Sequence, residues 1–489
     1  MLFYCTLAIP ILFGAVMPLL RLRTLKARGL YVETVTLLTT ALVWLLLAKH
    51  QGESYTLLSI MDGLTLCFRI DGMSAVFAGL VSFLWPLASC YALEYMTHEN
   101  HQKVFFCFYN MTYGVTLAVA FSASLFTLYV FYECLTLITL PLVIHKQDAA
   151  SARAGRRYLT YSITGAAMAF MALIGLIHFG GDTGFVLGGI LQGGQAAGHE
   201  RLLRFLFLLA FVGFGTKAAV FPMYAWLPAA SVAPTPVTAL LHAVAVVNTG
   251  AFAVLRTIYY SFGTDLLRGT PAQWIALLLA CFTIVFGSSM AVKEQHFKRR
   301  LAYSTISNLS YMLMGAALMT PGGMVGSLSH MVIHGLMKIT LFYCAGAVLV
   351  RTDREYVQEL RGFSRVMPYT CAVYTLGSVA MVGIPPLCGF VSKWNLLTAA
   401  AATGHWTGTV AVAALIVSAV LTAIYLFGPM TAMYFRPLNP SEAALADRRR
   451  DPTWLMKLPL AVLCLAMVAL GLYSGPLISF LRAIADGLR

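Results

Sequence analysis

The sequence predicts an all-α integral membrane protein with about fourteen transmembrane helices. Of its 489 residues, 59% are hydrophobic and only 11% are charged, and the mean hydropathy is +0.79. Soluble domains carry about 25% charged residues, so a chain this apolar is suited to hydrocarbon. Windows of about 20 apolar residues, the length that crosses a bilayer, recur at 2–20, 30–48, 72–93, 104–122, 124–145, 157–179, 202–222, 237–260, 272–292, 301–320, 325–350, 369–399, 408–434 and 455–484.

The basic residues predict the orientation of these helices. With the N-terminus outside, 22 of the 33 Lys and Arg residues fall in the loops of one side. Because cytoplasmic loops are enriched in Lys and Arg, both termini are expected on the outer face of a prokaryotic inner (plasma) membrane. This topology also explains the net charge of +14, so no nucleic acid partner is expected. The first apolar segment lacks a basic n-region and an A-x-A-like site, which predicts a retained helix and not a signal peptide.

Cofactor signatures are missing from the sequence. The ten cysteines occur singly, without a C-x-x-C pair, so neither a disulfide framework nor a zinc or iron–sulfur site is expected. No Walker, Rossmann or haem-ligand motif is found. We therefore expect no bound cofactor or metal and no redox centre in this chain.

A short repeat suggests two related halves. The stretch GFGTK at 213–217 returns as GFVSK at 389–393. It predicts five-helix repeats at 104–260 and 272–434, flanked by a three-helix segment at 1–103 and a terminal helix at 435–489. Since five is odd, the second repeat would be inverted relative to the first. A chance match between glycine-rich helices is the alternative.

Prolines interrupt the two helices that carry the repeated lysine, the seventh and the twelfth. Proline removes a backbone donor, and freed backbone groups can bind water inside a membrane protein where they line a cavity. Interrupted helices of inverted repeats typically hold ion sites near the midplane. The breaks are predicted at Pro222, Pro234, Pro236, Pro385 and Pro386.

Titratable residues inside the apolar segments are the candidate functional residues. A charge at the bilayer centre costs about 3 kcal/mol on insertion scales, so each one needs a reason. By contrast, Asp71 and Glu94 lie at the two ends of the third helix and are expected to be wetted. The candidates are Glu133, Lys217, His242, His330, His334, Lys338 and Lys393.

Glu133 and Lys217 are expected to pair, because pairing offsets part of the desolvation of each ion. Burial lowers the pKa of an amine, and a nearby carboxylate raises it again. Movement of Glu133 relative to Lys217 would therefore load or release a proton. A static salt bridge between two helices is the alternative.

The spacing of His330, His334 and Lys338 places three titratable groups on one helix face, about 6 Å apart along the axis. One or two water molecules could bridge such gaps. Zinc binding by the histidines is the competing interpretation, but no carboxylate or thiol is near in sequence to complete a tetrahedron. His242 is either a relay member or a packed polar residue; it follows Lys217 across the proline-rich turn, where the next helix would return it to a similar depth.

Two basic runs at helix ends are expected to face lipid phosphates. They are Arg153, Arg156 and Arg157, and Lys298, Arg299 and Arg300.

Several segments resemble the antiporter-like subunits shared by respiratory complex I, Mrp-type cation/proton antiporters and energy-converting membrane-bound hydrogenases. These segments are YECLTLITLPL around Glu133, KAAVFPMYAWLPAASVAPTPVTALLHA at 217–243, RRLAYSTISNLSYM at 299–312, HMVIHGLMKITLFYCAGA around Lys338 and GIPPLCGFVSKWNLL around Lys393. The resemblance implies fourteen helices, inverted five-helix repeats with broken helices 7 and 12, and a central axis of charged residues. In that picture Glu133 and Lys217 modulate the first half, and the histidines and Lys338 connect to a terminal proton site at Lys393. Some complex I members carry Glu there, and GFVSKW looks closest to the Mrp D-type and hydrogenase-type subunits.

The leading hypothesis is a proton-translocating subunit of a larger membrane complex, coupled to redox chemistry in partner subunits. Its expected partners are other membrane subunits, including antiporter-like or small ones, a redox arm, and lipid. The alternative is a subunit of an Mrp-type Na⁺/H⁺ antiporter driven by the proton gradient alone. A scaffold without transport, or a subunit used for inorganic-carbon uptake, is a third hypothesis.

Overall fold

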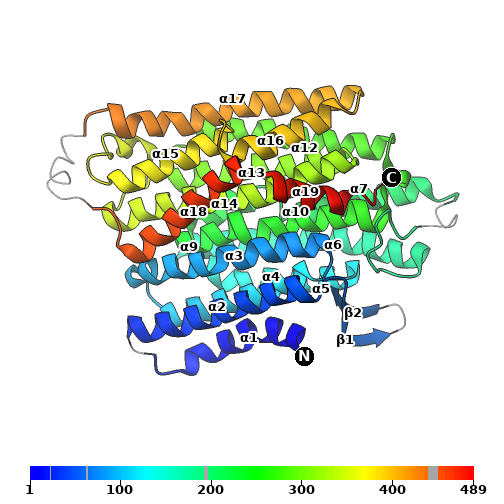
Figure 1. The fold of residues 1–489 in the computed structure, drawn as a ribbon, viewed down its shortest axis with the longest axis horizontal. Coiled ribbons are helices and arrows are strands. Elements are labelled where there is room, and N and C mark those ends of the chain that lie inside the picture. The colour runs from blue at the N-terminus through cyan, green and yellow to red at the C-terminus, as the bar shows by residue number, and fades with distance from the viewer. Residues whose placement is uncertain (23, 62–63, 192–196, 439–449, 489) are drawn as a thin grey trace.

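The structure, a computed structural model, describes residues 1–22, 24–61, 64–191, 197–438 and 450–488. Its helices lie side by side along a common direction, from α1 at one edge of the molecule to α17 at the opposite edge (Figure 1). Among the described residues, ten helical segments are long and apolar enough to cross a membrane. They are α1 (Leu2–Val16, continued by η1, Met17–Leu19), α2 (Leu25–Lys49), α3 (Gly72–Tyr95, continued by η2, Met96–His98), α5 (Leu125–Val143), α6 (Ala149–Gly180), the segment Thr235–Phe262, α12 (Pro271–Lys293), α14 (Pro321–Thr352), α17 (Trp406–Phe435) and α18 (Trp454–Leu472).

The other four predicted spans are also helical, but they are more polar or interrupted. They are α4 (Gln102–Ala120), α7 (Glu200–Gly215), α13 (Phe297–Ala317) and the pair α15 (Pro368–Val382) and α16 (Cys388–Ala401). The predicted span 455–484 is divided into α18 and α19 (Gly475–Ala485). The remaining short elements are α8 (Trp226–Ala229), η3 (Ala230–Val232), α11 (Thr264–Leu267) and η6 (Val357–Leu360).

Polar side chains start several of these helices by satisfying free amide groups. The Asp71 carboxylate accepts from the Ser74 amide and the Ser74 hydroxyl accepts from the Asp71 amide, which forms a capping box at α3. Asp148 and Ser151 do the same for α6. These local signals fix where apolar segments begin, whereas hydropathy alone leaves their ends undefined.

A β-hairpin corrects the all-α prediction. Strands β1 (Ser54–Met61) and β2 (Leu64–Arg69) pair antiparallel, with Ser54 opposite Arg69. The hairpin projects from one end of the bundle (Figure 1). Its β-branched and aromatic residues favour a strand, but hydropathy does not distinguish so short a segment from a loop between two apolar helices.

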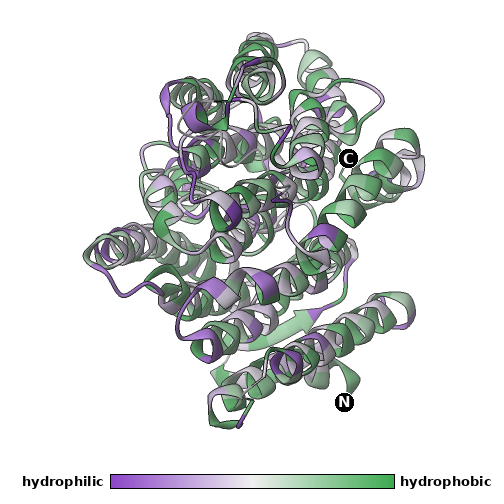
Figure 2. Ribbon diagram, turned by 90° about the vertical axis from the view of Figure 1, so that its left-hand side faces the viewer, coloured by the Kyte–Doolittle hydropathy of each residue, from purple (hydrophilic) through white to green (hydrophobic). Residues whose placement is uncertain are grey.

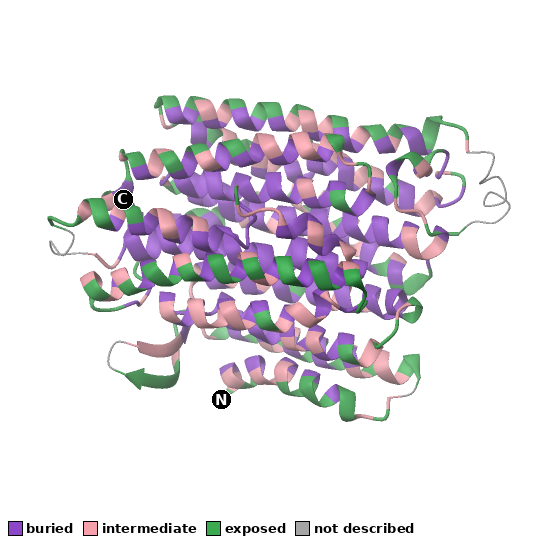
Figure 3. Ribbon diagram, turned by 180° about the vertical axis from the view of Figure 1, so that it is seen from behind, coloured by how far each residue is buried: buried purple, intermediate pink, exposed green. Residues whose placement is uncertain are grey.

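Among the ten apolar spans, the most deeply buried are α14 and the segment Thr235–Phe262. Figure 3 shows buried residues concentrated in the central helices, with exposed residues on the outer ones. The apolar window of Thr235–Phe262 is 100% buried, although this segment is not a regular α-helix. It consists of α9 (Thr235–Ala239), the π-turn η4 (Leu240–Val244), α10 (Val246–Arg256) and the π-turn η5 (Thr257–Phe262). Seen along the helices, hydrophilic residues gather mostly in loops and turns (Figure 2).

Two non-helical stretches interrupt the bundle next to the repeated lysines. Residues 216–225, which include Pro222, separate α7 from α8. Residues 383–387, which include Pro385 and Pro386, separate α15 from α16. Pro234 precedes α9 and Pro236 lies in its first turn. Each interruption leaves carbonyls or amides of the preceding and following helices without intrahelical partners.

Candidate functional site

Helix α14 carries three buried titratable side chains through the centre of the bundle. His330, His334 and Lys338 are each 0% exposed. The rings of His330 and His334 are 6.0 Å apart between centroids, as their helical spacing requires. Both ring nitrogens of His334 lack a hydrogen-bond partner among the described residues. Buried polar atoms in native proteins are nearly always bonded to protein or to water, so these nitrogens mark a place suited to water.

His330 connects α14 to the second lysine helix. Its Nδ1 lies 3.0 Å from the hydroxyl oxygen of Ser392, the residue before Lys393. The Tyr311 ring of α13 packs at 5.2 Å from the His330 ring and lies 5.5 Å from the Lys393 ammonium. Helices α13, α14 and α16 therefore meet around these three side chains.

Lys393 binds the end of the broken helix that precedes it. Its ammonium donates to the carbonyl oxygens of Met381 at 2.7 Å and Val382 at 3.1 Å. These are the last residues of α15, where carbonyls lack intrahelical donors and the helix dipole is negative. The sequence motif predicted a lysine beside a break, but not that the break supplies its hydrogen-bond acceptors.

Lys338 is held against α13. Its ammonium donates to the carbonyl oxygen of Leu301, at 3.2 Å, and to the hydroxyl of Ser304. As with Lys393, neutral oxygens and not a carboxylate surround the charge.

Lys217 lies just after the end of α7 and is 0% exposed. Its ammonium donates to the Tyr132 carbonyl and sits over the Tyr132 ring, 3.4 Å from the centroid. The expected ion pair is not formed: no Glu133–Lys217 contact within 4.0 Å occurs in the described part of the chain, and Glu133 Oε1 has no hydrogen-bond partner there. Tyr132 and Glu133 are successive residues of α5 and so point in different directions, and the carbonyl of the first binds the lysine.

Gly250 of α10 lets the backbone around Lys217 approach closely. A Cβ at this position would lie 2.5 Å from the Ala218 amide nitrogen and 2.8 Å from the Lys217 carbonyl carbon. Only glycine leaves room for the non-helical segment here.

His242 lies in the π-turn η4, where the first half of the chain packs against α14. Its ring packs 4.8 Å from the Phe342 ring of α14, and neither ring nitrogen has a partner among the residues described. Single π-turns inside helices are frequent at functional sites. The packing places His242 against the helix that carries His330, His334 and Lys338.

Two basic residues expected at the lipid surface are buried instead. Lys298 donates to the Ala233 carbonyl at 3.1 Å, and Arg300 donates to the carbonyls of Glu294 and Tyr425 at 2.8 and 3.1 Å. Within the run 298–300 only Arg299 is exposed. Successive residues point about 100° apart around a helix, so a run of three cannot face one side. This helical spacing was the signal in the sequence that Lys298 and Arg299 would not share one exposed face.

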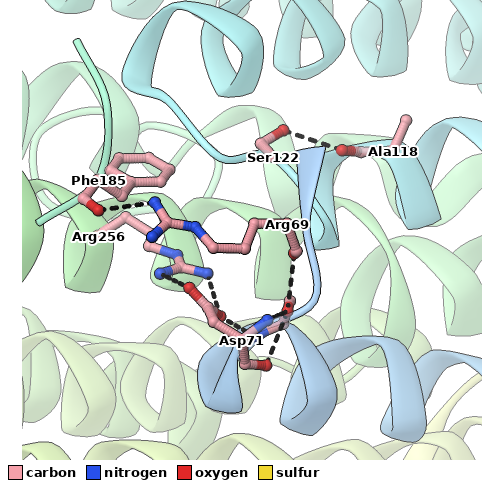
Figure 4. Close-up of polar contacts among 7 residues, drawn as sticks. Arg69, Asp71, Ala118, Ser122, Phe185 and Arg256 are labelled. Carbon is pink, nitrogen blue, oxygen red and sulfur yellow. Dashed lines mark hydrogen bonds and ion pairs between the residues drawn. The ribbon is translucent and has the colours of Figure 1, made fainter. Parts of the chain in front are cut away.

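The ends of α3 are also not simply wetted. The Asp71 carboxylate accepts two hydrogen bonds from Arg256, at 2.7 and 2.6 Å, although the Asp71 side chain keeps 23% exposure (Figure 4). Arg256 is fully buried, and its guanidinium lies 4.6 Å from the centroid of the Tyr260 ring. At the other end, Glu94 is 6% exposed and accepts from the Thr453 amide at 2.9 Å. The sequence placed these acids at helix ends but gave no sign of partners so distant along the chain.

Comparison with known proteins identifies relatives of this arrangement. The family model described as NADH:quinone oxidoreductase/Mrp antiporter, TM, matches residues 122–422, and the model described as NADH-Ubiquinone oxidoreductase (complex I), chain 5 N-terminus, matches residues 60–106. The A/B subunit of a probable K(+)/H(+) antiporter from Rhizobium meliloti is 32% identical over 84% of this chain, which spans 40% of that protein. NADH-quinone oxidoreductase subunit N of Desulforudis audaxviator is 31% identical over 84% of this chain and 82% of its own length.

A solved structure shares the fold. A chain of the Mrp complex from Dietzia sp. DQ12-45-1b superposes with a TM-score of 0.86 at 24% identity, covering 99% of this chain and 52% of that one. The family match over more than half of the chain and the two relatives above 30% identity lead to one conclusion: this multi-pass membrane protein belongs to the NADH:quinone oxidoreductase/Mrp antiporter transmembrane family.

Proposed function

We propose that this chain is a proton-translocating, antiporter-like subunit of a multisubunit membrane complex, and that redox chemistry in partner subunits drives it. The observation that carries the proposal is a set of amines and imidazoles inside the bundle: Lys217, His242, His330, His334 and Lys338 are fully buried, and Lys393 is partly buried. In the described residues these amines bind carbonyl or hydroxyl oxygens. The sequence shows no nucleotide or cofactor motif, and redox chemistry in neighbouring subunits would supply the energy in this proposal.

In this proposal Glu133 and Lys217 modulate the first half, His242, His330, His334 and Lys338 conduct, and Lys393 is the terminal site. Water bridges the gaps, which exceed hydrogen-bond length: the His330 and His334 rings are 6.0 Å apart. The unpartnered nitrogens of His242 and His334 support hydration of this path. The open carbonyls of α15 support Lys393 as a site where a cation is held without a carboxylate.

The finer architecture belongs to the same proposal. The ten apolar spans and the more polar or interrupted segments α4, α7, α13 and α15–α16 would together form fourteen transmembrane helices, with inverted repeats at 104–260 and 272–434. Both termini would lie on the outer face of a prokaryotic inner membrane. The excess of Lys and Arg in alternate loops supports this orientation.

The test uses the assembled complex in inverted membrane vesicles. Lys217→Ala and Lys393→Ala are expected to abolish proton uptake during turnover while the complex still assembles. Lys146→Ala, which removes an exposed lysine, is the matched control. Normal proton uptake per electron in either relay variant, measured by quenching of a pH-sensitive dye, would refute the relay.

A second candidate function is cation/proton exchange driven by the proton gradient alone. The observation that favours it is the similarity to the Rhizobium meliloti antiporter protein. Gradient-driven Na⁺ or K⁺ exchange in vesicles that contain the complex but no electron donor would support this function over redox-coupled pumping.

A further inference from the structure

A pocket of about 510 Å³ opens at the basic end of the bundle, outside the relay. It lies between the start of α6, the segment that joins α7 to α9, and the start of α13. The charged and aromatic residues that line it are Arg153, Arg157, Tyr224, Glu294, Arg299 and Tyr303.

The three arginines of this pocket have no protein partner in the part of the chain that the structure describes. No ion pair or side-chain hydrogen bond involves Arg153, Arg157 or Arg299, and all three are exposed. Glu294 supplies one opposing carboxylate, and its Oε1 already accepts from the His296 amide at 3.0 Å. The pocket therefore has an excess of positive charge and unused guanidinium donors, the groups that bind phosphate best.

An aromatic strip continues from the pocket along α12. The Tyr224 ring packs 4.8 Å from Phe286 and 5.9 Å from Phe221, and Phe221 packs 4.9 Å from Phe282. Phe282 is 52% exposed, although it lies about 17 Å from the end of α12 at Lys293 and so within the apolar part of the bundle. A ligand that fits both features carries an anionic head and a hydrocarbon chain.

We propose that this pocket binds the phosphate of an anionic phospholipid through Arg153, Arg157 and Arg299, with an acyl chain along Phe221, Phe282 and Phe286. The exposed aromatic strip favours a lipid over free phosphate, which would leave that strip unused. Basic pockets between helices on the cytoplasmic side are suited to such headgroups.

The bound lipid would also steady the segment that carries Lys217. Tyr224 lines the pocket, and two residues later Trp226 Nε1 donates to the carbonyl of Thr216 at 2.8 Å. Thr216 directly precedes Lys217, so the pocket wall is connected to the lysine by one hydrogen bond and a few residues of non-helical chain. This consequence rests on the proposed transport function, whereas lipid binding itself does not.

The test measures lipid binding to the delipidated complex by native mass spectrometry, without turnover. Phosphatidylglycerol, phosphatidylcholine and inorganic phosphate are the probes. The double variant Arg157→Gln/Arg299→Gln is expected to weaken phosphatidylglycerol binding about tenfold or more, since charge-assisted hydrogen bonds are lost. The matched control is Arg361→Gln/Arg365→Gln, which removes the same charge from exposed residues outside the pocket and should leave binding unchanged.

Three results would overturn the proposal. Equal phosphatidylglycerol binding by the two double variants would show that the pocket is not the site. Inorganic phosphate that competes as well as the lipid would make it a free-anion site. A photoreactive residue at Tyr224 that cross-links to a neighbouring protein, and not to lipid, would make it a protein interface. If the Arg157→Gln/Arg299→Gln variant bound no lipid but pumped normally, the pocket would still be the lipid site. Only the proposed effect of the bound lipid on Lys217 would be refuted.

Discussion

Replacement of Gly250 by alanine tests whether the placement of Lys217 depends on close backbone contact. The new Cβ would lie 2.5 Å from the Ala218 nitrogen, and ordinary van der Waals contact begins at 3.4 Å. The two backbones would have to separate by about 1 Å, because neither neighbour is a flexible side chain. Overpacking of this kind costs about 1–3 kcal/mol.

The expected result is a lower melting temperature of the assembled complex together with a loss of proton uptake. A shift of about 1 Å at a reacting group can lower a rate about a hundredfold, so transport should fall much more than stability. The control is Gly428→Ala on α17, where a Cβ meets nothing within 4 Å. That variant should melt at the same or a higher temperature, since alanine favours a helix by up to about 1 kcal/mol over glycine. Wild-type melting and wild-type transport in Gly250→Ala would refute the close contact and the dependence of Lys217 on it.

Three further predictions concern charged groups outside the predicted relay. Arg256→Met should destabilise the complex by about 1–3 kcal/mol, because the Asp71 carboxylate loses both hydrogen bonds from Arg256; the double variant with Asp71→Asn should recover part of this loss, and simple additivity in melting experiments would contradict the pairing. Lys298→Met should change the melting temperature little, since loss of the hydrogen bond to the Ala233 carbonyl is offset by removal of a buried charge; a clear decrease in melting temperature would contradict this balance. The pKa of Glu355, in the loop after α14, is held below its usual 4.5 by the polar contact with His296, whose Nε2 lies 3.6 Å from the Glu355 Oε2. This contribution to stability is present above pH 4.5 and is lost as the pH falls through the lowered pKa, so in melting curves recorded against pH, Glu355→Gln should show a smaller acid-induced decrease than the unchanged chain.

The fold class was accessible from the sequence because the bilayer imposes a simple rule. Apolar windows of about 20 residues predict spans, and the ten apolar helices follow that rule. The rule fails where backbone amide and carbonyl groups find partners outside a continuous α-helix. The hairpin Ser54–Arg69 pairs its backbone between strands, and α15 and α16 place a break where the hydropathy is continuous.

The sequence was enough to choose the candidate residues, but it did not show which groups contact each of them. Titratable side chains in apolar helices are visible in the sequence, and so are the prolines beside two of the lysines. The groups that bind each charged side chain depend on which helices pack together. Arg256 and Asp71, for example, pair although they are 185 residues apart in the sequence. Complementary charge predicted Glu133 as the partner of Lys217, whereas the backbone carbonyl of the preceding residue takes that place.

The three lysines of the proposed relay share one feature that bears on the proposed transport. Lys217 binds a carbonyl, Lys338 a carbonyl and a hydroxyl, and Lys393 two carbonyls at the end of α15. Neutral dipoles compensate a buried ammonium only in part, whereas a carboxylate at contact distance would hold it in a strong ion pair. An ammonium surrounded by dipoles therefore remains sensitive to a charge that approaches from outside the contact shell. In a relay driven by neighbouring subunits this sensitivity is the required property, and a permanent ion pair at Lys217 would remove it.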